Sequence, residues 1–290
     1  MTGGETFLRD DIFEIAYLWY KNTALDSLSI TSNGSMPEKI EKFCKQARCN
    51  SLPVFFFLSY DFIEEKHSEY RNLKKLHINV VESYKIIKKY GFNTTFQLTL
   101  SPLTIDSAFD TYCYMRDVLK VQNINCNLLR GHKTIDISFE EKQKIATVYE
   151  KIQRQMDVDY TSNILQGFND DFVLNNILNA KNRIIWKYLL KIFKDTKFIC
   201  PCVAGSLMGV IYSDGSVFPC ELLSDSFGNL KDYDFNFQKC WESRTAKKLK
   251  KCILEQKCFC TYEFAWLLNI FSHPRYYPEL IFQMLKKRKF

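Results

Sequence analysis

The sequence predicts an α/β fold: a parallel sheet with helices, followed by a small cysteine-rich α+β domain. Short apolar runs alternate with amphipathic segments through residues 1–135, a pattern typical of strand–helix units. Residues 136–197 are helical in pattern, and Gly, Asp and Cys become frequent from residue 198. We therefore divide the chain into a sheet domain (1–135), a helical connector (136–197), a cysteine-rich domain (198–270) and a basic helical tail (271–290).

The sheet domain contains four expected strands and four expected helices. The strands are placed at 25–31, 53–58, 92–100 and 124–129, and the helices at 10–21, 36–46, 72–90 and 106–120. Apolar strands joined through helices indicate a parallel sheet covered by helices. Polar residues follow the strand positions, and the working site of such folds lies at the carboxyl ends of the strands. These polar clusters are Gly4-Glu5, Asn33-Gly34, Ser59-Tyr60-Asp61 and Arg130-Gly131.

The rest of the chain has a different pattern. Helices are expected at 139–156 and 172–194, with a polar loop between them. A β-hairpin is expected across 209–218, because Asp214-Gly215 is a typical hairpin turn between two short apolar runs. One helix at 237–254 and an aromatic helical segment at 263–290 complete the chain.

Composition limits the class of protein. Of the 290 residues, 46% are hydrophobic and 15% aromatic, which excludes a mainly disordered chain. The longest apolar run, Val54–Leu58, is far shorter than the roughly 20 residues of a membrane span. The chain begins without a secretory signal pattern, so we expect a cytoplasmic protein with no membrane or nucleic-acid partner. The net charge is +7, with Lys and Arg concentrated at 239–257 and 286–289; this bias favours an acidic partner or simply a solvated helix face and tail.

The cysteines indicate a metal site. Seven of the 11 cysteines fall between residues 200 and 260, and clustered thiols in a reducing compartment indicate metal before disulfides. Cys202 and Cys220 bracket the hairpin, while Cys258 and Cys260 are two residues apart, about 6.5 Å in an extended chain. That spacing suits the separate irons of an iron–sulfur cluster better than the usual zinc spacing, but it leaves cluster, zinc and plain thiols open. The competing cysteines are Cys200, Cys240 and Cys252.

Five segments of the sequence carry a resemblance to a known family. The stretch CVAGSLMGVIYSDGSVFPCELL, with the later KCFCTYE, resembles the C-terminal SPASM or twitch domain of radical S-adenosylmethionine (radical SAM) enzymes. TGGETFLRD is similar to the family's Gly-Gly-Glu motif at its second strand. ITSNG resembles the third-strand motif, and FFFLSYDFIEEKHSEYR resembles the fourth-strand segment. The resemblance spans nearly the whole chain.

The resemblance implies a fold, two cofactors and a set of site residues. Residues 1–135 would form a partial radical SAM barrel and 198–270 a SPASM/twitch domain. Gly3, Gly4 and Glu5 would bind the amino group of S-adenosylmethionine. The remaining implied residues are Asn33 beside that site, Ser59 and Asp61 toward the ribose or carboxylate, Arg71 toward the carboxylate, and Cys202, Cys220, Cys258 and Cys260 as ligands of an auxiliary [4Fe-4S] cluster.

The sequence departs from the family pattern in two places. The C-x3-C-x2-C loop that holds the catalytic cluster belongs before Gly-Gly-Glu and does not occur here, so we expect an N-terminally truncated chain that is inactive by itself. Met1 and Thr2 fit as the last residues of a strand. The family often ends C-x-C-T-H-E-C, where this chain has Tyr262 and Phe264 in place of His and Cys.

The resemblance implies a function for the complete protein. It would cleave S-adenosylmethionine reductively and abstract hydrogen from a peptide or protein substrate, with an electron donor such as a flavodoxin or ferredoxin. The alternative is a non-catalytic, metal-stabilised binding protein that carries a cluster or zinc in the cysteine region.

Overall fold

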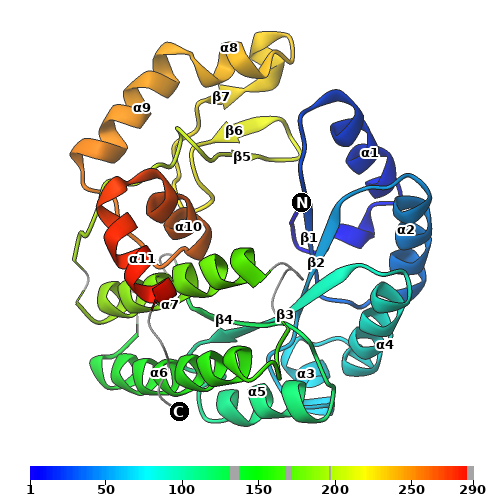
Figure 1. The fold of residues 1–290 in the computed structure, drawn as a ribbon. Helices are drawn as coiled ribbons and strands as arrows, with labels where there is room; N and C mark the ends of the chain where they lie inside the picture. The colour runs from blue at the N-terminus through cyan, green and yellow to red at the C-terminus, as the bar shows by residue number, and fades with distance from the viewer. Residues whose placement is uncertain (131–136, 167–171, 196, 286–290) are drawn as a thin grey trace. The chain divides into compact units, whose positions relative to one another are not determined.

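The computed structural model describes residues 1–130, 137–166, 172–195 and 197–285 (Figure 1). Gly131 and the basic residues of 286–289, which the sequence analysis singled out, lie outside these residues. The chain forms two compact units. Unit 1 comprises Met1–Leu128 with Thr147–Asp171, and unit 2 comprises Leu129–Ala146 with Phe172–Phe290.

Unit 1 contains the predicted parallel sheet. Its four strands follow one another in chain order and every neighbouring pair is parallel, as the sequence predicts. The strands are β1 (Leu28–Ser32), β2 (Val54–Ser59), β3 (Asn93–Leu100) and β4 (Ile124–Leu128). The helices that accompany them are α1 (Ile12–Asn22), α2 (Pro37–Cys49), α3 (Glu65–Tyr70), α4 (Leu76–Lys89) and α5 (Ala108–Asp117), after a short 3-10 turn, η1 (Thr6–Leu8).

One face of this sheet is buried and the other is partly exposed. Ile30, Phe56 and Phe96 are fully buried, and Phe43 of α2 and Tyr84 of α4 pack on that face edge-on against Phe56 and Phe96. Burial alternates along β2 and β4, whereas a sheet covered on both faces would be buried throughout. The partly exposed face, called the open face below, consists of Ser29, Thr31, Phe55, Phe57, Ser59, Gln97, Thr99, Asn125 and Asn127.

The boundaries of α4 show why helix limits are hard to predict. The helix ends before Gly91, whose φ of 77° is the left-handed conformation that favours glycine after a helix. Its start was expected at Asn72 but lies at Leu76, because Asn72 and Lys75 both have positive φ. The residues before this break form α3, a separate short helix that the sequence analysis did not predict.

Two further segments complete unit 1. Met1 lies beside β1, where its carbonyl accepts the N–H of Thr31 at 3.0 Å. Helix α6 (Phe139–Thr161) is longer than expected, and its second half belongs to unit 1. Gln153 and Tyr160 of that half donate hydrogen bonds to carbonyls of β4, at 3.3 and 3.1 Å. The division into units therefore does not follow the expected helical connector, since β4 binds part of it.

Unit 2 contains the predicted hairpin and the cysteine region. Strands β5 (Val210–Ile211), β6 (Ser216–Phe218) and β7 (Gly228–Asn229) form an antiparallel sheet. The expected helix at 237–254 is two helices, because Ser243 interrupts it and its hydroxyl accepts the Ala246 N–H at 3.1 Å as an N-cap. The helical elements are α7 (Phe172–Asp195), η3 (Leu230–Tyr233), α8 (Phe237–Trp241), α9 (Arg244–Glu255), α10 (Glu263–Ser272), η4 (Pro274–Tyr276) and α11 (Tyr277–Leu285). No helix among the described residues has the length and apolar character needed to cross a bilayer.

Candidate functional site

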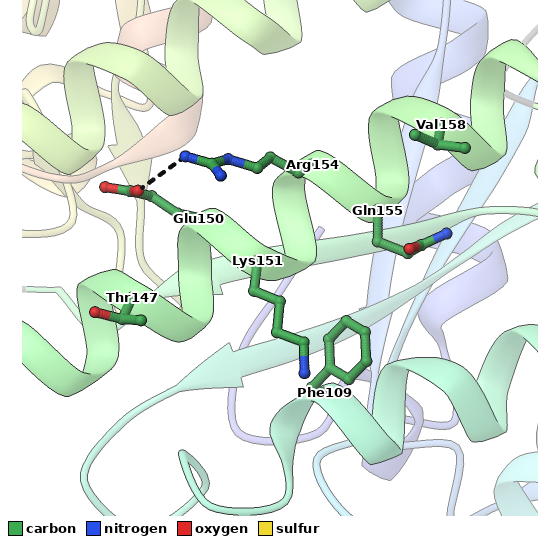
Figure 2. Close-up of a pocket in the computed structure, with 7 residues that line it drawn as sticks. All are labelled: Phe109, Thr147, Glu150, Lys151, Arg154, Gln155 and Val158. Atoms are coloured by element: carbon green, nitrogen blue, oxygen red, sulfur yellow. Dashed lines mark ion pairs between the residues drawn. The ribbon is translucent and has the colours of Figure 1, made fainter. Parts of the chain in front are cut away.

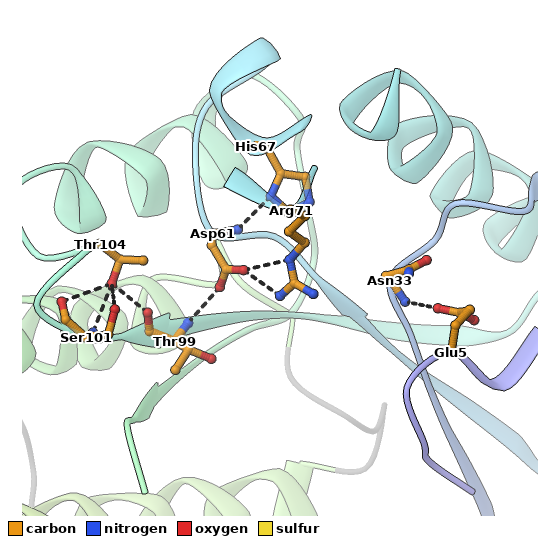
Figure 3. A network of polar contacts seen from close by, with 8 residues as sticks. All are labelled: Glu5, Asn33, Asp61, His67, Arg71, Thr99, Ser101 and Thr104. Atoms are coloured by element: carbon orange, nitrogen blue, oxygen red, sulfur yellow. Dashed lines mark hydrogen bonds and ion pairs between the residues drawn. The ribbon is translucent and has the colours of Figure 1, made fainter. Parts of the chain in front are cut away.

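Glu5 joins the beginning of the chain to the end of β1. Its Oε1 accepts the Phe7 N–H at 3.0 Å and the Ser32 hydroxyl at 2.8 Å, and its Oε2 accepts the Asn33 N–H at 2.6 Å (Figure 3). The Ser32 hydroxyl oxygen also accepts the Gly34 N–H at 2.9 Å. Glu5 and Asn33, two predicted site residues from separate segments, are thus brought together. The Glu5 carboxylate orders the loop after β1 through the chain's own donors.

Gly3 and Gly4 face open space. A Cβ added at either glycine would meet no atom of the described chain within 4 Å, and both residues are exposed. The fold therefore has no steric need for glycine at these two positions. Open backbone beside an ordered carboxylate allows a ligand to approach closely, which is the common use of such a glycine pair.

The carboxylate of Asp61 accepts three hydrogen bonds, as many as that of Glu5. Asp61 is 2% exposed and follows β2 by two residues, while Ser59 ends that strand. One carboxylate oxygen accepts hydrogen bonds from Nε of Arg71, at 2.9 Å, and from its Nη2; the other accepts the Thr99 N–H at 3.2 Å. Asp61 therefore connects β3 to the end of α3, where Arg71 is the C-cap. Arg71 was expected to pair with the cofactor carboxylate, and in this structure two of its nitrogens pair with Asp61.

His67 supports Asp61 and was not among the predicted site residues. Its Nδ1 accepts the Asp61 N–H at 3.2 Å, and the Tyr60 ring lies 4.7 Å from the imidazole. Burial, with the nearby Arg71 and His77 cations as smaller causes, lowers the pKa of His67 to about 3. The ring is therefore neutral with its proton on Nε2, which is buried without a hydrogen-bond partner among the described residues. The signal in the sequence was His67 and Arg71 at i and i+4 just after Asp61.

The end of β3 is held by a compact network of hydroxyls. Oγ1 of Thr104 donates to the Thr99 carbonyl at 2.7 Å and accepts the Ser101 N–H at 2.9 Å (Figure 3). Since Thr99 also bonds to Asp61, this network fixes the backbone to which Asp61 is anchored. Polar contacts thus run along the carboxyl ends of β1, β2 and β3, within unit 1.

The four predicted cysteine ligands lie together in unit 2. Burial, reinforced by the neighbouring thiols of Cys202, Cys220 and Cys258, raises the pKa of Cys260 to about 12. The pKa of Cys220 is raised for the same reasons, by burial first and then by Cys202, as well as by Glu221. Cys202 and Cys258 also pack against the hydrophobic cluster that contains Cys220. The hairpin and the 258–260 segment thus place the four cysteines in one part of unit 2.

The competing cysteines have other surroundings. Cys240 packs in a hydrophobic cluster with Val217, Phe227 and Ala246. Burial raises the pKa of Cys200, while contacts with Tyr276 and Arg275 lower it. Cys252 lies on α9, two turns before the cysteine pair.

The donor set of the four thiols fits an iron–sulfur cluster. Among the described residues, no three His, Cys, Asp or Glu side chains are arranged to hold a single metal ion. Cys202, Cys220, Cys258 and Cys260 lie together in unit 2, and four cysteines are the usual ligand set of a [4Fe-4S] cluster. The fit rests on this donor set and on the burial of the thiols.

A shallow hollow lies elsewhere on unit 1. Its volume is about 410 Å³, and none of the predicted site residues line it. Nζ of Lys151 lies 3.6 Å from the ring centroid of Phe109, and Arg154 pairs with Glu150 on the same helix. The lining residues are Phe109 of α5 and Thr147, Glu150, Lys151, Arg154, Gln155 and Val158 of α6 (Figure 2).

Comparisons with known proteins show what the chain and its fold are similar to. No family model matches the chain. An AdoMet-dependent heme synthase of Methanosarcina barkeri is 23% identical over 275 residues, which cover 90% of this chain and 75% of that protein. Among solved structures, native anSMEcpe with bound AdoMet and the Kp18Cys peptide superimposes with a TM-score of 0.60 at 16% identity, covering 97% of this chain and 83% of that one. The same enzyme with AdoMet and the Cp18Cys peptide gives 0.60 at 17% identity, with 97% and 84% covered.

The chain therefore has the radical SAM fold. The curated relative, at 23% identity, is similar to this chain over 275 residues, in agreement with the resemblance that the motifs carry.

Proposed function

We propose that this chain binds S-adenosylmethionine at the carboxyl ends of β1 and β2 and holds an auxiliary [4Fe-4S] cluster on Cys202, Cys220, Cys258 and Cys260. One observation carries the proposal most directly. Residues from distant segments, Glu5 with Asn33 and Asp61 with Arg71, are bonded to one another at the same edge of one sheet. Ligands of open α/β sheets bind at this edge.

The residues of this edge divide into those that contact the cofactor and those that position them. The exposed backbone of Gly3 and Gly4 binds the amino group, while Glu5 holds that backbone against Asn33. Ser59 and Asp61 face the ribose or carboxylate. Arg71 uses Nε and Nη2 for Asp61, and its Nη1 has no hydrogen-bond partner among the described residues, so we assign that nitrogen to the cofactor carboxylate.

The chemistry follows from the cofactors. S-adenosylmethionine and a reduced [4Fe-4S] cluster together supply reductive cleavage and hydrogen-atom abstraction from the substrate. The chain's own part is to bind and orient the cofactor, to exclude water and to hold the auxiliary cluster. Cleavage also requires a C-x3-C-x2-C segment, which the 290 residues do not contain.

A peptide is the substrate class that the open face fits best. Gln97, Asn125 and Asn127 present carboxamides on this face. Nδ2 of Asn125 donates to Oδ1 of Asn127 at 2.8 Å, and the other carboxamide groups can donate to and accept from peptide groups. Phe57 of β2 adds an apolar surface. The anSMEcpe structures with bound peptides support this choice. For the electron donor we propose an acidic carrier such as a flavodoxin or ferredoxin, because α9 exposes Arg244, Lys247, Lys248 and Lys251.

Cofactor binding tests the first part of the proposal. The chain is reconstituted anaerobically, and iron, sulfide and zinc are measured per chain alongside S-adenosylmethionine binding by equilibrium dialysis. We expect about four irons and four sulfides for one cluster, and binding that Arg71→Gln weakens at least tenfold while Arg48→Gln, on the exposed side of α2, leaves it unchanged. One zinc with no sulfide would instead identify a zinc-stabilised binding protein.

Peptide binding tests the second part. A cysteine-containing peptide is titrated by fluorescence anisotropy against the protein and against Gln97→Ala and Asn127→Ala. Both variants are expected to bind at least fivefold more weakly, with free energies of unfolding within about 0.5 kcal/mol of the parent, since the two side chains are partly exposed. Gln256→Ala, an exposed residue after α9, serves as the control. Equal affinity in all variants would remove the open face from the peptide site.

A further inference from the structure

Arg130 forms a charged cluster with three residues of unit 2. Its Nη2 lies 3.0 Å from Oε1 of Glu221, and its Nη1 lies 3.7 Å from Oε2 of Glu263. The guanidinium carbon is 4.3 Å from the centroid of the Tyr262 ring, which places a cation over an aromatic face. One side chain therefore contacts three others that come from two separate segments.

Both segments carry the predicted cluster ligands. Glu221 directly follows Cys220, and Tyr262 and Glu263 follow Cys260 by two and three residues. A second contact strengthens the connection, because the Thr261 hydroxyl donates to the carbonyl of Leu129 at 3.3 Å. The two residues after β4 thus hold the Cys220 segment and the Cys258–Cys260 segment together. An exposed ion pair by itself contributes little to folding stability. Here, however, one guanidinium connects two loops whose cysteines have to be held at fixed relative positions.

The charges of this neighbourhood are unbalanced without Arg130. Four thiolates and the carboxylates of Glu221 and Glu263 are all negative when a cluster is bound, and Arg130 is the cation in contact with both carboxylates. Nearby charge and hydrogen bonds are among the main factors that set the reduction potential of an iron–sulfur cluster. A cation here favours the reduced, more negative state.

We propose that Arg130 is a positioning residue for the auxiliary cluster: it holds the two cysteine segments in register and raises the reduction potential of the cluster. The inference rests on the proposed function, because it requires a cluster on Cys202, Cys220, Cys258 and Cys260. It adds a residue outside the cysteine motifs to that site. It also assigns opposite electrostatic effects to Arg130 and Glu221.

The test compares Arg130→Gln, Arg130→Lys and Glu221→Gln with the parent and with Arg48→Gln. Arg48→Gln is the matched control, since it removes one exposed positive charge from α2, away from the cysteine region. Iron and sulfide are counted per chain, and the midpoint potential is measured by an anaerobic redox titration followed by electron paramagnetic resonance. Circular dichroism checks that each variant is folded.

The expected shifts have opposite signs. Arg130→Gln lowers the equilibrium constant for one-electron reduction about tenfold, which is a potential about 59 mV more negative. Glu221→Gln shifts the potential upward, and Arg130→Lys stays close to the parent potential with faster loss of iron. Arg48→Gln changes neither the potential nor the iron content. Unchanged potentials in Arg130→Gln and Glu221→Gln, in a parent that holds its cluster, would overturn this inference alone. A parent without iron and sulfide would overturn the proposed function itself.

Discussion

The backbone N–H of Asn33 donates to Oε2 of Glu5 at 2.6 Å, which joins two segments 28 residues apart in the chain. The same carboxylate accepts hydrogen bonds from Phe7 and Ser32. Three donors converge on one partly buried side chain. The direct role of Glu5 is therefore to hold the loop after β1 and the start of the chain in place. Its effect on cofactor binding passes through the backbone that it holds.

Glu5→Ala tests this structural role. It leaves three donors without their acceptor and should lower the free energy of unfolding by about 1–3 kcal/mol, measured by urea denaturation. S-adenosylmethionine binding should weaken in parallel. Glu14→Ala, on the exposed side of α1, removes the same group without these contacts and should stay within about 0.5 kcal/mol of the parent. Equal stability of the two variants would show that the Glu5 contacts contribute nothing to the fold.

Gly4→Ala separates folding from binding. The added methyl group meets no atom of the described chain within 4 Å, so the free energy of unfolding should change by less than about 0.5 kcal/mol. If the cofactor lies against this backbone, the same methyl group should weaken S-adenosylmethionine binding at least tenfold. Dialysis and urea denaturation on the same preparation measure the two effects. Unchanged affinity would place the cofactor away from Gly4.

His67 should make the fold sensitive to acid. Its pKa is about 3 in the folded chain and about 6.5 in an unfolded one. Between these values the unfolded state binds more protons, so the free energy of unfolding falls as the pH is lowered below about 6.5, by up to about 1.4 kcal/mol per pH unit. His67→Gln keeps an acceptor for the Asp61 N–H and should have a shallower slope between pH 6 and pH 4.5.

The control for this slope is His273→Gln. His273 is the C-cap of α10 in unit 2, away from Asp61 and Tyr60 in unit 1. Urea denaturation at several pH values gives the slope for each protein. The prediction fails if His67→Gln and the parent lose stability equally steeply on acidification.

Cysteine substitutions should distinguish the cysteines that bind the cluster from those that do not. Cys258→Ser and Cys260→Ser each remove one of four thiols and should lower the iron content after anaerobic reconstitution by at least half. Cys252→Ser changes a thiol on α9 close by in the sequence and should retain the iron of the parent. Iron and sulfide assays with visible absorbance measure the outcome. Equal iron loss in all three would mean that the 258–260 pair has no special role.

The parallel sheet was predictable because its strands are short apolar runs between well-marked turns. β7 was missed, since Gly228-Asn229 is extended only through its pairing with β6. The break before α4 was also missed, because positive φ at Asn72 and Lys75 is a tertiary effect that neither residue type requires. The break between α8 and α9 could have been predicted from Ser243, because serine commonly caps the start of a helix.

Motifs predict part of the candidate site, and tertiary contacts decide the rest. The four cysteines were proposed from their positions at turns and lie in one part of unit 2, while their role as ligands stays a prediction. The role of His67 depends on its contact with the Asp61 backbone, which only the folded chain creates. Arg71 was expected to pair with the cofactor carboxylate, whereas its ion pair with Asp61 is a tertiary contact between residues 10 positions apart.

The two faces of the sheet in unit 1 are subject to different constraints during evolution. Ile30, Phe56 and Phe96 fill a packed interior, where a change of volume costs stability. Gln97 and Asn127 are partly exposed, so their replacement carries little folding cost. Sequence changes are therefore tolerated better on the open face than in the packed interior, so the two faces of one sheet can diverge at different rates.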